Sequence, residues 1–435
     1  MTRWVLARKC AVQLSLSWGV VACTAPADPP FESRPLPFSN QPVETRARAP
    51  ERRFIDPQTL PEPFATVSAT RNIQVRRPGG IPVLYAPPGF SVQAWASGLS
   101  GPRRALALAN GDVIVAESFG LKVSILRDTD GDGRPDRRAD LLEGTSRPYG
   151  LAHSDGWLYV GFENAVVRAR FEPGDLGISS EPEVIASLPG GGHWTRDLAF
   201  SDNGATLFVG IGSQSNYNGQ GREPPNRALI LAMNPDGSNS RVYASGLRNP
   251  SSLAIQPDTG DLWAAVTERD GLGDDLPPDF ATAVRSGGFY GWPWAYLGPN
   301  PEPRLSELDP EAIARSLVPD VLLPPHGTPL GAAFYQGDMF PSGYDGDLLV
   351  ALHGSYNRSK RSGYSVLRIP MNESGRPEGG FETFIDGFGG GPGPVWGRPT
   401  GLTLLADGSL LVLDDGSQHI WRVTYHPPAP VGSEP

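Results

Sequence analysis

The chain has 435 residues, a formal net charge of −10 and 19% charged residues. Its 53 glycines and 46 prolines, which follow no collagen-like period, are typical of a chain with many turns between short strands. The acidic balance and the lack of a long Lys/Arg tract argue against a general nucleic-acid binder, because binding phosphates requires clustered basic residues.

The first residues predict a signal peptide over 1–22. Arg3, Arg8 and Lys9 give a positive start, and a moderately apolar stretch follows over residues 10–22. That stretch is too short and too polar to remain in a bilayer as a spanning helix. We therefore expect an exported protein.

The end of this segment, Val-Val-Ala-Cys, resembles a bacterial lipobox. It predicts cleavage before Cys23 and a lipid on that thiol, which would hold the protein at the periplasmic face of the outer membrane. Ordinary cleavage near Ala25 or Ala27 is the alternative. Cys10 and Cys23 are the only cysteines, so the folded domain is expected to lack disulfides.

The segment 23–78 is rich in Pro, Arg and Glu and shows little periodicity, which predicts a disordered tether. A pro-segment or a partner-binding arm is the alternative. The last residues, 428–435, predict a disordered tail. The domain between these segments spans residues 79–427.

One pattern recurs through this domain: a turn, an alternating apolar strand, a second turn, usually with glycine, and a strongly apolar strand. Six units of about 58 residues each suit four-stranded antiparallel blades. The pattern predicts an all-β, six-bladed β-propeller, with a β-sandwich or β-solenoid as alternatives. The copies begin at residues 102, 148, 195, 250, 329 and 399.

A hairpin in the first unit carries oxygen donors at alternate positions, as in the first half of a calcium loop. The donors are Asp128, Asp130, Asp132 and Asp136, but Ala139 stands where the loop would carry a glutamate. We expect a structural calcium ion here. An acidic hairpin turn without a metal is the alternative.

In a propeller, the residues that precede the innermost strands meet around the axis, so polar groups there are candidates for one site. His193 follows three glycines and suits a general base, because its ordinary pKa lies near physiological pH. Arg248 is a fork-shaped cation that suits a carboxylate or quinone oxygen. A surface-turn histidine and an ion-paired blade arginine are the respective alternatives.

Later units add further candidates. The acidic, Gly-rich loop 268–275 suits a hard cation such as calcium, although it also reads as a solvated loop. His326, the segment 352–358 and Arg398 stand near the starts of the fifth and sixth units. Their shared placement, rather than any one of them, indicates a site.

Together these segments resemble the glucose/sorbosone dehydrogenase family, and the sorbosone-dehydrogenase-like branch in particular, from Gly89 to Tyr425. The resemblance implies a six-bladed propeller that binds pyrroloquinoline quinone and Ca²⁺. It also implies oxidation of an aldose or a similar hydroxyl or hydrated aldehyde, with electrons passed to an external acceptor. The segments are 192–196, 212–216, 246–250, 268–275, 288–293 and 352–358.

The resemblance also implies roles for single residues. His193 matches the catalytic base. Arg248 and Asn249 match the pair that contacts the quinone. Asp270 and Gly271 match the loop whose backbone carbonyls hold the active-site calcium.

Arg398 matches an arginine that binds a cofactor carboxylate, and Arg196 and His353 are further expected cofactor contacts. The sequence departs from the glucose-oxidising branch at three places. Ser213 stands where that branch has an acidic partner for the base, and Asp270 begins a pair that replaces Gly-Pro. The cofactor lysine has no match, and His353 occupies the nearby motif.

Two other functions remain open on the sequence. The propeller could be a non-catalytic, lipid-tethered module that binds a glycan or a protein partner through its axial funnel. It could also be a hydrolytic propeller of the lactonase type, which would need carboxylate and Asn ligands from several blades at the axis.

Overall fold

A computed structural model describes residues 34–35, 42–71, 73–76, 78–144, 146–217, 223–389 and 393–427. The predicted signal peptide, Cys23 and the tail 428–435 lie outside the described residues. Within the described part of the chain, no helix is long and apolar enough to cross a membrane.

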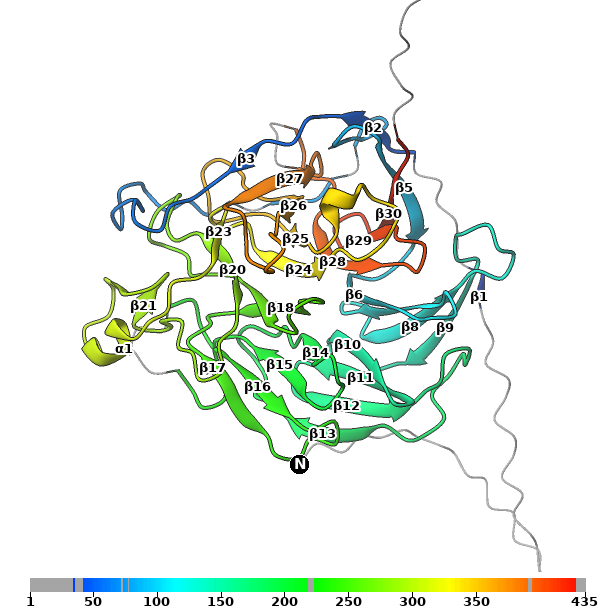
Figure 1. Ribbon diagram of the computed structural model, residues 1–435, viewed down its shortest axis with the longest axis horizontal. Helices are drawn as coiled ribbons and strands as arrows, with labels where there is room; N and C mark the ends of the chain where they lie inside the picture. The colour runs from blue at the N-terminus through cyan, green and yellow to red at the C-terminus, as the bar shows by residue number, and fades with distance from the viewer. Residues whose placement is uncertain are drawn as a thin grey trace, which may run out of the picture. The chain divides into compact units, whose positions relative to one another are not determined.

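The prediction of a six-bladed β-propeller is confirmed. Six antiparallel sheets, each contributing a four-stranded blade, follow one another around a ring (Figure 1). The first strand of each blade contacts the first strands of both neighbouring blades, so six first strands surround the axis.

Blades 1 to 3 come directly one after another in the chain. Blade 1 is preceded by the short strand β1 (Arg34–Pro35), which pairs with its last strand. From the axis outward, the three blades consist of β6 (Pro102–Ala107), β7 (Val113–Glu117), β8 (Lys122–Arg127) and β9 (Arg137–Leu142); β10 (Pro148–Ser154), β11 (Trp157–Phe162), β12 (Ala165–Arg170) and β13 (Glu183–Ser187); and β14 (Leu198–Phe200), β15 (Leu207–Ile211), β16 (Leu229–Met233) and β17 (Arg241–Ser245).

Blade 4 carries an insertion with β21 (Ala295–Tyr296), β22 (Asn300–Pro301) and the one-turn helix α1 (Pro310–Ala314), and blade 5 carries a 3-10 turn (Ser342–Tyr344). Blade 6 closes the ring, because its outermost strand comes from the start of the domain. The blades consist of β18 (Pro250–Ile255), β19 (Leu262–Val266), β20 (Asp279–Ala283) and β23 (Val321–Leu323); β24 (Pro329–Phe334), β25 (Leu348–Leu352), β26 (Ser365–Ile369) and β27 (Phe381–Ile385); and β28 (Pro399–Leu404), β29 (Leu410–Asp414), β30 (His419–Tyr425) and β5 (Phe90–Ser97).

The core lies between the blades. Because blades stack face to face, the second strands have both faces covered, and β7, β15, β19, β25 and β29 are buried along their whole length. This explains their near-continuous Val, Leu, Ile and Ala content. Close approach of first strands requires glycine at two places, since a Cβ on Gly331 would lie 2.3 Å from the Thr400 carbonyl oxygen and one on Gly401 2.6 Å from that of Arg103.

A buried arginine joins the blades at the axis. Arg104 forms a two-point ion pair with Asp197 (2.8 Å for both bonds) and donates to the carbonyls of Ser251 (2.8 Å) and Leu330. The Tyr149 hydroxyl lies within 3.1 Å of the same two carbonyls. These five residues come from blades 1 to 5, so the cluster fastens the first strands to one another.

The prediction of a disordered tether over residues 23–78 is wrong for the part of this segment that the structure describes. Residues 42–71 and 73–76, here named the N-terminal strap, lie along the propeller. Within the strap, β2 (Glu44–Ala47) pairs in parallel with β4 (Val83–Ala86), and β3 (Arg52–Arg53) adds a fifth strand to blade 5 beside β27. Extended segments can pair with sheet edges whatever their hydrophobic pattern. The local periodicity of the strap sequence therefore could not predict these two strand pairings.

Candidate active site

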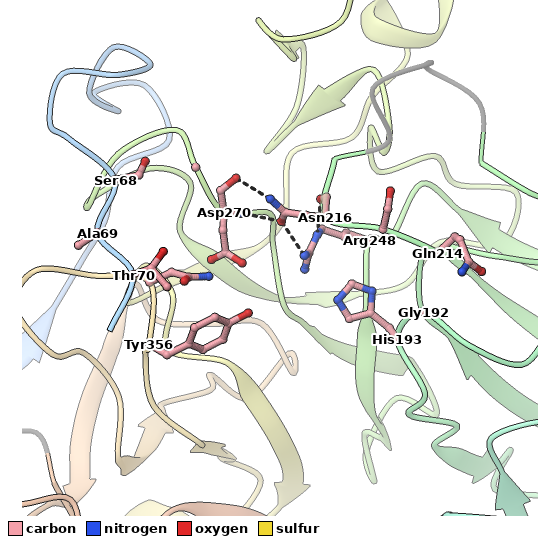
Figure 2. A pocket seen from close by; sticks show the side chains of 13 residues that line it. Ser68, Ala69, Thr70, Gly192, His193, Gln214, Asn216, Arg248, Asp270 and Tyr356 are labelled. Carbon is pink, nitrogen blue, oxygen red and sulfur yellow. Dashed lines mark hydrogen bonds between the residues drawn. The ribbon is translucent and has the colours of Figure 1, made fainter. Parts of the chain in front are cut away.

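A cavity of about 540 Å³ opens among the loops that precede or follow the strands of blades 3 to 5. Figure 2 shows its lining side chains pointing into one space from separate segments. They include His193, Asn216, Arg248, Asp270, Tyr356 and Thr70. The structure therefore brings together His193, Arg248 and the Asp270–Gly271 loop, as the sequence predicted.

The loop before β14 fixes the His193 ring. The backbone N–H of His193 donates to the Ser213 carbonyl (3.0 Å), and Nδ1 lies 3.0 Å from both that carbonyl oxygen and Ser213 Oγ. The Ser213 hydroxyl donates its hydrogen to the Ser215 carbonyl (2.8 Å). Nδ1 must therefore carry the hydrogen and donate to Ser213, which leaves Nε2 with a free lone pair.

Ser213 thus replaces the acidic partner with neutral acceptors. It holds the same tautomer that a carboxylate would hold, without adding a negative charge. Burial, reinforced by the nearby Arg248 cation, lowers the pKa of His193 to about 3. His193 is consequently neutral at physiological pH, with the Nε2 lone pair unprotonated.

Asn216 connects Arg248 to Asp270, and the sequence did not single it out. Its Oδ1 accepts from Arg248 Nη2 (2.9 Å) and from the Asp270 N–H (2.8 Å), while its Nδ2 donates to the Asp270 carbonyl (2.9 Å) (Figure 2). The available signal was its place at the end of the 212–216 segment. The remaining Arg248 bonds to protein go to the backbone carbonyls of Asn216, Thr267 and Glu268, so among the described residues one Nη2 hydrogen has no acceptor.

The Asp270 carboxylate is held from the other side by His326. His326 Nδ1 lies 2.8 Å from Asp270 Oδ1, and its Nε2 lies 3.0 Å from the Gly273 carbonyl oxygen. Burial opposes both charges, but the pair raises the pKa of His326 and lowers that of Asp270. The cavity therefore contains an ionised carboxylate facing the neutral His193.

The Asp270 backbone carbonyl is not available in the way the calcium prediction requires. Besides the bond from Asn216, it accepts one from Arg304 Nη1 (2.7 Å). Arg304 is in turn held by both oxygens of the buried Glu302 (2.6 and 2.9 Å). Both lone pairs of the carbonyl are used, and the adjacent guanidinium would repel a divalent cation, so this arrangement does not fit calcium on that carbonyl.

A second polar cluster joins blades 1, 5 and 6. Arg398 Nη2 donates to His353 Nδ1 (3.0 Å), so His353 Nε2 carries a hydrogen and donates to Asp415 Oδ1 (3.0 Å). Arg103 Nη2 lies 2.6 Å from Asp415 Oδ2. Burial lowers the pKa of His353 to about 4, so this histidine is neutral at physiological pH. The charged groups of the cluster are then two arginines and one carboxylate.

Arg103, like Asp415, is a member of this cluster that the sequence did not indicate. Its Nε is buried and has no hydrogen-bond partner among the described residues. Its guanidinium lies 5.3 Å from the centre of the Trp194 ring, and Trp194 directly follows His193. The cluster is thus next to the His193 loop, although Arg398 and His353 do not line the cavity described above.

Two predicted cofactor contacts lie behind the cavity wall. Arg196 is fully buried and donates to the carbonyls of Pro189, His193 and Thr195. Asn249 accepts from Thr195 Oγ1 (2.9 Å). Both stabilise the loop that carries His193, Arg196 through its two Nη atoms and Asn249 through Oδ1, and neither residue lines the cavity.

The acidic hairpin of blade 1 belongs neither to the cavity nor to the cluster around Asp415. Asp128, Asp130 and Asp132 each offer an oxygen, and these oxygens lie within 4.8 Å of one another. Asp136 is not part of this group, since its carboxylate accepts from the N–H and hydroxyl of Thr129.

Two family models match the chain. The glucose/sorbosone dehydrogenase model matches residues 155–356, and a TrAA12-like model matches residues 306–426. An uncharacterized protein of Borreliella burgdorferi is 29% identical over 64% of this chain and 76% of its own length. Aldose sugar dehydrogenase YliI of Escherichia coli is 26% identical over 36% of this chain, a match that spans only 44% of that protein.

A solved structure, the holo form of the pyranose dehydrogenase PQQ domain from Coprinopsis cinerea, superposes with a TM-score of 0.69. It is 21% identical and covers 81% of this chain and 100% of that one, a likeness that shows the shared fold. The family match, the fold and the cavity agree with one another. Over residues 155–356 the chain is therefore similar to the glucose/sorbosone dehydrogenase family.

Proposed function

We propose that the protein is a quinone-dependent oxidoreductase that oxidises a hydroxyl or hydrated aldehyde of a sugar. The observation that carries this proposal is the tautomer of His193, whose Nε2 is a fixed, neutral proton acceptor on the axial cavity. The family match and the pyranose and aldose dehydrogenases among the similar proteins support the same reaction class.

The donor set suits an anionic quinone. Pyrroloquinoline quinone carries three carboxylates, and the structure offers Arg248 at the cavity, Arg103 beside Trp194, and Arg398 near the same Asp415 carboxylate as Arg103. The Arg103 Nε–H group is buried and has no hydrogen-bond partner among the described residues, so this donor still lacks an acceptor. We assign Arg248 to a quinone oxygen, and Arg103 and Arg398 to the carboxylates, with His353 holding Arg398 in place.

When bound, the quinone supplies a two-electron acceptor for the hydride that leaves the substrate carbon. The protein's own part is to position the substrate and to take its proton. His193 Nε2 accepts the hydroxyl proton as the carbon–oxygen double bond forms. Asn216 keeps the Arg248 guanidinium fixed, so the cation that stabilises charge on the acceptor needs no rearrangement.

Reconstitution tests the proposal. The purified protein, loaded with pyrroloquinoline quinone, should reduce a redox dye when neutral aldoses are added, and should not do so without quinone. Assays with Ca²⁺ and with a chelator belong in the same series. Quinone binding without any sugar-dependent reduction across the panel would reject the dehydrogenase.

We also propose that the blade 1 hairpin binds a structural calcium ion through Asp128, Asp130 and Asp132. Calcium about 100-fold above its Kd should stabilise the fold by about 2.7 kcal/mol. Asp130→Asn should abolish this gain in a thermal unfolding series with and without calcium. Asp155→Asn, at another hairpin turn, should keep it, and an equal response of all three proteins would remove the metal from this hairpin.

A further inference from the structure

The N-terminal strap is attached to the propeller both before and after the strap residues that line the cavity. Before them β3 pairs with β27 of blade 5. After them Val75 forms a parallel bridge with Val395, and the Arg76 N–H donates to the Val395 carbonyl (2.8 Å). The segment between these two attachments includes Ser68, Ala69 and Thr70, which line the cavity.

Hydrogen bonds join this segment to the loop that contains Asp270. The Phe64 N–H donates to the Leu272 carbonyl (2.6 Å), and Thr66 Oγ1 accepts from the Asp274 N–H (2.7 Å). Gly273 has a φ of +131°, and a Cβ there would lie 3.0 Å from Thr66 Oγ1. The glycine thus permits the strap to lie directly against the active-site loop.

The strap is held a second time just beyond the cavity. The Arg71 N–H donates to the carbonyl of Tyr356, whose ring lines the cavity. Between these two sets of hydrogen bonds, Ser68, Ala69 and Thr70 form the wall opposite His193 (Figure 2). A segment outside the blades therefore completes the site.

The chemistry of this wall indicates its ligand. Neither the Ser68 nor the Thr70 hydroxyl has a hydrogen-bond partner among the described residues, and 52% of the Tyr356 residue surface is exposed at the rim. Two free hydroxyls beside an aromatic ring, with no charge on any of the three side chains, suit a neutral polyhydroxylated ring. An anionic sugar would find no cation on this wall.

We propose that Ser68, Thr70 and Tyr356 form the sugar subsite, so that the N-terminal strap sets substrate specificity. The assignment rests on the proposed function, since it names the part of the same site that holds the substrate. Arg248, Arg103 and Arg398, which we assign to the quinone, are not on this wall. Changes to the strap should therefore separate sugar affinity from quinone affinity.

The test uses the full chain with the double variant Ser68→Ala/Thr70→Val. We expect the KM for the best neutral aldose to rise about tenfold, because two hydrogen bonds to the sugar are lost. The calorimetric Kd for pyrroloquinoline quinone and the kcat should stay within about twofold. Thr70→Ser, which keeps the hydroxyl, and Thr59→Val, on the strap outside the cavity, should both match the wild type.

An unchanged KM in the double variant would overturn the proposal, as would a rise in KM matched by an equal rise in the quinone Kd. Calorimetric titration of the quinone-free protein with the same aldose separates this outcome from a failure of the dehydrogenase function. If the wild type turns over no sugar but binds it, weaker binding by the double variant supports the subsite and equal binding refutes it. If the wild type neither turns over nor binds a neutral sugar, the subsite is refuted together with the function.

Discussion

His193→Gln should lower sugar-dependent dye reduction about 10²- to 10⁴-fold while leaving the quinone Kd close to that of the wild type. The reason is that Nε2 is the fixed proton acceptor of the cavity, and loss of a positioned general base has this range of effect. Steady-state kinetics of the quinone-loaded protein give kcat and KM, and calorimetry gives the quinone Kd. The fall should appear in kcat rather than in KM, because the substituted group acts on the proton in the transition state.

His426→Gln, at an exposed histidine far along the chain, is the matched control and should keep wild-type kinetics. The pH profile adds a second check. Burial and Arg248 lower the pKa of His193 to about 3, so the basic form dominates above about pH 4 and is lost only as pH falls through 3. An acid limb of kcat/KM near pH 6.5 that disappears in His193→Gln would contradict this description of the base.

Arg104→Met should destabilise the propeller by about 3–5 kcal/mol. The substitution leaves the Asp197 carboxylate buried without its partner and removes the donor that serves the carbonyls of Ser251 and Leu330. Breaking one side of a buried, hydrogen-bonded ion pair has this cost. Equilibrium denaturation in urea, followed by tryptophan fluorescence, measures the change.

Arg46→Met provides the surface comparison, since Arg46 pairs with Glu44 at two exposed positions, and it should leave the midpoint of the urea transition unchanged within the error of the measurement. Arg104→Lys keeps the positive charge but loses the two-point guanidinium geometry, so its free energy of unfolding should lie between those of Arg104→Met and the wild type. If Arg104→Met were as stable as the wild type, the axial cluster would not hold the blades together.

The fold could be read from the sequence because each blade repeats the same local signals. Five of the six first strands begin at a proline that the repeat had marked, such as Pro102 and Pro399. The convergence of His193 and Arg248 followed from one geometric rule, that the segments preceding the first strand of each blade meet at the axis, whereas Asp270, which follows β19, was placed with them by the family resemblance. That rule needs no knowledge of side-chain contacts.

The missed features all depend on contacts between distant segments. Asn216 acquires its role only because Arg248 and Asp270 lie on either side of it. Arg103 belongs to the second cluster through Asp415, which is more than 300 positions away in the chain. Arg304 reaches the Asp270 carbonyl from the blade 4 insertion, and that contact changes what a family motif implies about calcium.

The central claim is that the blade entrances build one site for an anionic quinone, and calorimetric titration of the purified protein with pyrroloquinoline quinone tests it most directly. We predict saturable binding with one quinone per chain, weakened at least tenfold by Arg398→Gln and unchanged by His426→Gln. A protein that binds a glycan but gives no heat with the quinone would instead be a carbohydrate-binding propeller, and the dehydrogenase assignment would be wrong.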